Sequence, residues 1–163
     1  VIARRFAALG FDVRGYARTP RSIEGVATFA GGDQLAAFAD GLDIVVSVLP
    51  LTPETTGIMN AGFFGMLADG AFIINGGRGP QVDDDDLLAA LGSGKIGGAA
   101  LDVFTVEPLP QDHPFWTHPK VRVWPHVAAQ TNATSAAEQV AAAITAMMDG
   151  SEPANRVDWS RGY

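Results

Sequence analysis

Three polar residues whose types could support acid–base chemistry each follow an apolar run of the sequence: Arg78, Glu107 and His126. An arginine presents a planar fork of donors that suits a carboxylate. A carboxylate beside a histidine orients the ring and favours the imidazolium, which can give a proton to a carbonyl oxygen. Taken singly, each residue fits equally well a surface ion pair or a hydrogen-bonded loop histidine. The spacing alone therefore leaves catalysis as one of several interpretations.

The elements that must position these residues alternate along the chain. Strands are predicted at residues 11–16, 42–49, 71–75, 99–103 and 121–123. Helices are predicted at residues 1–9, 33–40, 60–68, 84–92 and 134–148. This alternation predicts an α/β fold with a doubly wound parallel sheet, and the nearly continuous apolar run at 42–49 predicts a strand buried on both faces. Ligands of such sheets bind beyond the carboxyl ends of the strands, where all three polar residues fall.

The acidic run at residues 83–86 is interpreted as the start of a helix rather than as a metal site. Asp83 can accept from the free N–H groups of the first turn, and negative charge is favourable at a helix N-terminus. Gly92 and Gly94 are expected to end this helix, and Gly10 to end the first one.

Composition limits the size of the domain and the kinds of partner and chemistry that the chain can have. The chain has 163 residues, 47% of them hydrophobic and 18% charged, which suits one compact domain. The net charge is −7 and no basic cluster exceeds the pair at residues 4–5, so no nucleic-acid partner is expected. There is no cysteine, which excludes disulfides and thiolate chemistry and is compatible with the cytoplasm. No apolar run approaches the ~20 residues of a membrane-spanning helix, so no membrane partner is expected.

Short sequence motifs around Arg78, Glu107 and His126 narrow the interpretation of their role. Three of them occur in order: NGGRG at residues 75–79, LDVFTVEPLP at 101–110 and PHVAA at 125–129. Two further words are LPLTPET at 49–55 and DDLLAAL at 85–91. Together they resemble the signature blocks of the D-isomer-specific 2-hydroxyacid dehydrogenases, over essentially the whole chain. The words FWTHP at 115–119 and VDWSRGY at 157–163 resemble a bacterial branch of that family that reduces glyoxylate and hydroxypyruvate.

The resemblance implies an NAD(P)-dependent oxidoreductase that reduces a small 2-keto acid to the D-2-hydroxy acid. Arg78 would bind the substrate carboxylate and polarise the keto group, His126 would be the general acid, and Glu107 would hold His126. The nicotinamide supplies the hydride. The positions that would contact the cofactor are Leu49, Pro50, Gly76, Gly77 and Asp102.

The end of the first visible strand bears on the choice of cofactor. Dinucleotide-binding domains that prefer NAD place an acidic residue there for the ribose hydroxyls. The segment at residues 16–21 has no acid and instead offers Arg18 and Thr19, which suit a 2′-phosphate. NADP(H) is therefore favoured, with NAD(H) possible and a solvated basic loop as the alternative.

The chain also departs from the family pattern. The Gly-x-Gly-x-x-Gly turn and the first strand are absent, and the resemblance places them just before Val1, together with a substrate domain. We therefore expect an N-terminally incomplete Rossmann-like domain at residues 1–150, with a helix at about 130–150 packing toward the substrate domain, and a tail at 151–163. Glycines at positions 76 and 77, where the family has larger residues, are expected to loosen the loop that aims Arg78.

This departure keeps other functions open. We expect weak or absent dinucleotide binding, and little activity, from the 163 residues alone. A truncated, non-catalytic dinucleotide-sensing or dimerisation module is the alternative to the enzyme, and a homodimer is expected in either case.

Overall fold

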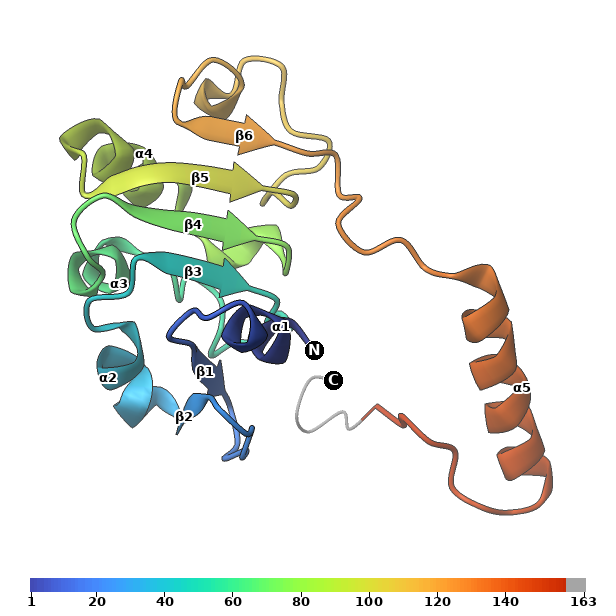
Figure 1. The fold of residues 1–163 in the computed structure, drawn as a ribbon. Coiled ribbons are helices and arrows are strands. Elements are labelled where there is room, and N and C mark those ends of the chain that lie inside the picture. Colours follow the sequence, from blue (N-terminus) through green and yellow to red (C-terminus); the bar gives the residue numbers. More distant parts are fainter. Residues whose placement is uncertain (158–163) are drawn as a thin grey trace.

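Six strands form two parallel sheets in the computed structural model, which describes residues 1–157 (Figure 1). The first sheet pairs β1 (Arg14–Ala17) with β2 (Ala27–Ala30). The second has the order β3 (Ile44–Ser47), β4 (Ala71–Asn75), β5 (Ile96–Leu101) and β6 (Val121–Val123). Every pairing is parallel, so the chain must cross over between neighbours. The predicted parallel α/β architecture is confirmed.

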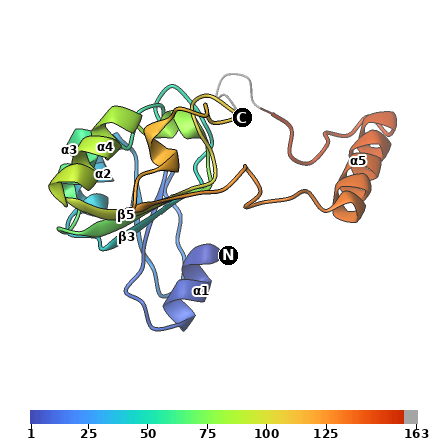
Figure 2. The same cartoon turned by 90° about the horizontal axis from the view of Figure 1, so that it is seen from above.

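The described residues form five helices. They are α1 (Ile2–Ala8), α2 (Leu35–Ala39), α3 (Ala61–Met66), α4 (Asp84–Ser93) and α5 (Ala133–Met148). Of these, α2, α3 and α4 connect successive strands, whereas α1 precedes β1 and α5 follows β6. Three single 3-10 turns are η1 (Gly32–Gln34), η2 (Gly79–Gln81) and η3 (Pro114–Trp116). Helices α2, α3 and α4 cover one face of the four-stranded sheet, and α1 lies on the other side (Figure 2). The core lies under the covered face, where side chains such as Phe64, Ile73 and Leu91 are fully buried.

The prediction that the central strands are buried on both faces is wrong for the described residues. Burial alternates along β3 and β4: Val45 and Ile73 are buried, whereas Ile44 and Phe72 are 47% and 51% exposed. The reason is that α1, the one described helix on the second face, has only 7 residues and leaves much of that face uncovered.

The strand predictions differ from the structure at β5, β2 and β1, and glycine in β5 and the short length of β2 hide the pattern. β5 begins at Ile96 rather than at residue 99, because Gly97 and Gly98 belong to it. A Cβ on Gly98 would lie 2.7 Å from the ring of Phe72, so this glycine leaves room for the Phe72 side chain of the neighbouring β4. β2, with four residues, was not predicted at all, and β1 begins three residues later than expected.

The capping prediction for α4 is confirmed at both ends, with one correction. The side chain of Asp83 accepts from the N–H of Asp86 at 3.0 Å, and Gly94 ends the helix in the left-handed conformation with φ 84°. Gly92 lies inside the helix rather than ending it, because the helix continues to Ser93.

Helix α5 stands apart from the two sheets at the end of an extended segment (Figures 1 and 2). None of its residues is buried, and its apolar side chains, among them Val140, Ile144 and Met147, are exposed. Of the expected tail at 151–163, residues 158–163 lie outside the described part of the chain. Within residues 1–157 no helix has the length and apolar character needed to cross a membrane.

Candidate functional site

The loops that follow β4, β5 and β6 meet at the carboxyl edge of the four-stranded sheet. Gly79, in the loop after β4, lies against the backbone of Phe104 in the loop after β5 so closely that a Cβ there would overlap the Phe104 carbonyl. The N–H of His126, after β6, donates to the carbonyl oxygen of Asp102 at 2.8 Å. These contacts bring the three predicted catalytic residues to one end of the sheet.

Glu107 and His126 form the predicted pair. Nδ1 of His126 lies 2.8 Å from Oε2 of Glu107, and Oε1 of Glu107 accepts from the N–H of Phe104 at 2.9 Å. The hydrogen bond from His126 lowers the pKa of Glu107 most, the bond from Phe104 lowers it further, and the charge of Arg78 acts in the same direction. The carboxylate is therefore ionised, held on both oxygens, and within the field of Arg78.

His126 has a left-handed backbone conformation, φ 56°, which costs a non-glycine residue about 1–2 kcal/mol. Buried Asp102 holds the residues that follow it: its two carboxylate oxygens accept from the N–H groups of Val127 and Ala128, at 2.8 and 2.9 Å. This pair of bonds stabilises the strained turn and so sets the direction of the imidazole. The cofactor contact expected of Asp102 stays a prediction.

Arg78 is held at its backbone and exposed at its side chain. Its N–H donates to Oε1 of Gln81 at 3.0 Å, and its carbonyl accepts from Nδ2 of Asn75 at 3.1 Å. Nη1 of the guanidinium donates to the carbonyl of Gly77 at 2.7 Å, which leaves the other donors for a ligand. A guanidinium at this edge can bind a planar carboxylate.

Sequence reasoning missed Asn75 and Gln81 as site residues and misjudged Gly77. Both amide side chains are buried, and both bond to the backbone of Arg78. Gly77 does not loosen the loop: it is buried, and its N–H donates to Oδ1 of Asn75 at 3.0 Å. A single amide carries no periodic or motif signal, so only three-dimensional contacts reveal these roles.

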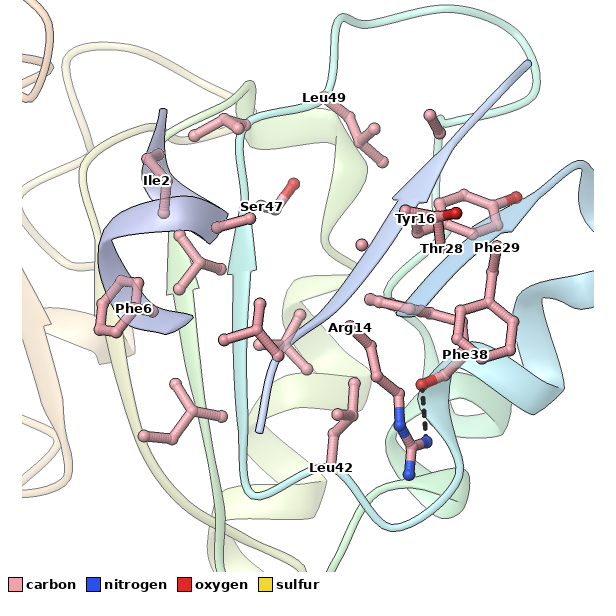
Figure 3. Close-up of a pocket in the computed structure, with 18 of the residues that line it drawn as sticks. Ile2, Phe6, Arg14, Tyr16, Thr28, Phe29, Phe38, Leu42, Ser47 and Leu49 are labelled. Carbon is pink, nitrogen blue, oxygen red and sulfur yellow. Dashed lines mark hydrogen bonds between the residues drawn. The ribbon is translucent and has the colours of Figure 1, made fainter. Parts of the chain in front are cut away.

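A cavity of about 830 Å³ lies between β1 and β3, which face each other without being hydrogen-bonded (Figure 3). Ile2 and Phe6 of α1 line one side of it, and Tyr16 lines the other. Most of its lining is apolar. Four of the predicted cofactor residues, Arg18, Thr19, Leu49 and Pro50, line it where β1 and β3 end.

The residues at this end of the cavity fit part of a phosphorylated dinucleotide. Arg18 and Thr19 are exposed at the end of β1. The pKa of Glu54, in the loop after β3, is lowered, chiefly by hydrogen bonding with Thr52 and to a smaller extent by the charge of Arg18. Arg18 and Thr19 thus offer a cation and a hydroxyl at this end of the cavity, which suit a phosphate. Gly76 is not among the residues that line the cavity; it lies beside Ala128, where a Cβ would meet only ordinary contact at 3.7 Å.

Comparison with known proteins gives a consistent match. The family model described as "D-isomer specific 2-hydroxyacid dehydrogenase, NAD binding domain" matches residues 1–128. Glyoxylate/hydroxypyruvate reductase A of Serratia proteamaculans is 49% identical over 162 residues, which cover 99% of this chain and 52% of the relative. The protein of the same name from Yersinia enterocolitica is 48% identical with the same coverage. The chain thus spans about half the length of the curated relatives it matches.

Solved structures agree with the fold. A D-isomer specific 2-hydroxyacid dehydrogenase from Xanthobacter autotrophicus, in complex with NADPH and MES, superposes with a TM-score of 0.96 at 48% identity, covering 99% of this chain and 66% of that one. An NADPH-dependent glyoxylate/hydroxypyruvate reductase from Sinorhizobium meliloti, in complex with NADP and sulfate, has a TM-score of 0.93 at 42% identity, covering 99% and 52%.

Proposed function

Because the chain belongs to the D-isomer specific 2-hydroxyacid dehydrogenase family, we propose that it is the cofactor-domain half of an NADPH-dependent reductase of small 2-keto acids, glyoxylate and hydroxypyruvate among them. The observation that carries the proposal is the contact of 2.8 Å between His126 and Glu107, with the charge of Arg78 acting on the same carboxylate. The reductases from Serratia and Sinorhizobium, named for these substrates, support the choice of 2-keto acid.

The residues divide the reaction between them. Arg78 binds the substrate carboxylate and so fixes the keto group relative to His126. Glu107 holds Nδ1 of His126, which directs Nε2 to the keto oxygen, and Nε2 donates the proton there as the oxygen becomes an alcohol. The nicotinamide cofactor, when bound, supplies the hydride to the carbonyl carbon.

The preference for NADPH is part of the proposal. Arg18 and Thr19 directly follow β1 and line the cavity, and the turn at residues 18–21 has no acidic residue to receive ribose hydroxyls, which supports a 2′-phosphate there. The two similar solved structures were determined with NADPH and with NADP, which supports the same choice.

We also propose that residues 1–150 are the cofactor domain and that α5 packs on a separate substrate domain, in a cytoplasmic homodimer. The exposed apolar side chains of α5 and of the open sheet face support such contacts, since exposed apolar surface of this extent marks interaction sites. Sedimentation equilibrium of the purified chain tests the proposed homodimer, and a monomeric mass at micromolar concentration would contradict that proposal.

The test of the activity is a chimera that joins this chain to the part of the Serratia reductase that the chain does not match. Oxidation of NADPH and NADH is measured at 340 nm with glyoxylate, hydroxypyruvate and pyruvate, beside the 163 residues alone. We expect turnover by the chimera, with NADPH preferred. A folded chimera that binds NADPH without oxidising it contradicts the enzyme and favours the non-catalytic, dinucleotide-sensing module.

A further inference from the structure

We infer that Gln81 is a positioning residue, which aims Arg78 by joining the loops that follow β3 and β4. The inference rests on the proposed function only for the ligand of Arg78. The hydrogen bonds of Gln81 to the two loops are seen in the structure itself. Gln81 lies in η2, between the catalytic loop and α4, and its side chain is completely buried.

The hydrogen bonds of the Gln81 amide use its full capacity. Oε1 accepts from the N–H of Arg78 at 3.0 Å and from Oγ of Ser47 at 3.3 Å. Nε2 donates to the carbonyl of Leu49 at 2.9 Å and to that of Pro50 at 3.0 Å. An amide offers two lone pairs and two N–H donors, so no capacity is left for a ligand. Gln81 therefore acts through its neighbours rather than on the substrate.

Gly77 makes this arrangement possible. A Cβ at position 77 would lie 2.5 Å from Oε1 of Gln81, closer than real Cβ atoms are found, and 3.0 Å from the carbonyl oxygen of Leu49, which is tighter than most real Cβ contacts. The loop after β4 therefore lies directly against the loop after β3, and the long amide reaches across the junction. The glycine and the glutamine form one unit, in which neither can be enlarged or shortened without moving Arg78.

The position of Gly77 and Gln81 between two proposed ligand sites explains their role. On one side Gln81 holds Leu49 and Pro50, which line the end of the cavity proposed for the cofactor. On the other side it holds the backbone of Arg78, proposed to bind the substrate carboxylate. Gln81 thereby sets the distance between the two ligands, which a hydride transfer requires to be short and constant.

The first experiment measures the joining directly in the 163-residue chain. Amide hydrogen exchange is followed by NMR in the wild type, in Gln81→Met, which keeps the length but has no amide, and in Gln81→Glu, which keeps an acceptor for the Arg78 N–H. We expect exchange at Arg78 to accelerate about tenfold in Gln81→Met, the equivalent of one net hydrogen bond, and less in Gln81→Glu. Ala90→Gly, at a buried position of α4, is the control for a general loss of stability.

The second experiment separates positioning from stability, in the chimera. Gln81→Met is expected to raise KM for the 2-keto acid and to lower kcat together, by about tenfold in kcat/KM, while Ala90→Gly leaves both near wild type. Unchanged exchange at Arg78 in Gln81→Met, or kinetics that match Ala90→Gly, overturns the inference. If the wild-type chimera is inactive, the proposed function fails and the exchange measurement still decides whether Gln81 holds Arg78.

Discussion

Nδ1 of His126 lies 2.8 Å from Oε2 of Glu107, although the two residues are 19 positions apart and follow different strands. The other carboxylate oxygen accepts from the backbone of Phe104, so the carboxylate is fixed in the loop after β5. The ring is fixed in turn by a backbone that Asp102 holds. Two loops, each anchored separately, thus present one acid–base pair, and Nε2 is the ring nitrogen that remains for a substrate.

The first prediction concerns the pH dependence of this pair. The pKa of Glu107 is lowered from its ordinary value of 4.5, so its ionised form stabilises the folded state. That contribution is complete above the ordinary value and is lost as the pH falls through the lowered one. Glu107→Gln should therefore lower the Tm at pH 7 and lose its effect toward pH 3. Both side chains are partly exposed, so we expect less than about 1 kcal/mol.

Thermal unfolding of the wild type and the variant between pH 3 and pH 7 measures the effect. Asp85→Asn, at an exposed position of α4, is the control for a general change in charge. A Tm difference between Glu107→Gln and the wild type that grows as the pH falls would show that the sign is wrong.

The second prediction tests the general acid. His126→Asn should lower kcat of the chimera by about 10²–10⁴-fold and leave the affinity for NADPH unchanged. Asparagine is chosen because it tolerates the φ of 56° that this position requires, whereas alanine would add backbone strain. His118→Asn, in the loop after η3, is the matched control. Loss of NADPH affinity with normal turnover of the bound cofactor would refute the assigned role.

Part of this arrangement could be predicted from sequence. The position of Arg78, Glu107 and His126 after apolar runs predicts that their loops meet at one edge of the sheet, but their choice as a catalytic set also needed the resemblance of the surrounding motifs to the family. Gln81 could not be found, since its role depends on carbonyl groups 31 and 32 positions away. The exposed face of β3 also escaped prediction: an apolar run shows that a strand can be buried on both sides, but not which helices cover it.

The third prediction concerns the contact between the loops after β4 and β5. Gly79→Ala would place a Cβ against the carbonyl of Phe104, and backbone cannot move aside as a flexible side chain can. We expect a loss of about 1–3 kcal/mol in the free energy of unfolding, measured in urea. Gly92→Ala, in α4 with no atom within 4 Å of the new Cβ, should instead stabilise by about 0.5–1 kcal/mol. Equal effects of the two substitutions would contradict the close approach at Gly79.

The fourth prediction tests Asp102 as the residue that holds the turn at His126. Asn has one acceptor oxygen in place of two, so Asp102→Asn leaves the N–H of Val127 or of Ala128 without a partner. We expect a loss of about 1–3 kcal/mol in the free energy of unfolding and a lower kcat in the chimera. An unchanged free energy of unfolding would mean that these two bonds do not stabilise the turn.

The last prediction addresses the choice between the two cofactors. Arg18 lines the cavity at the end of β1, and its charge contributes to the lowered pKa of Glu54. A guanidinium–phosphate bond contributes about 1.5–3 kcal/mol, so Arg18→Ala in the chimera should raise KM for NADPH by about 10–100-fold. KM for NADH should change little, because that cofactor has no 2′-phosphate. Arg4→Ala, at an exposed position of α1 that does not line the cavity, is the matched control. If KM for both cofactors rises equally, Arg18 contributes a general positive field or supports the fold, and the preference for NADPH must come from other residues.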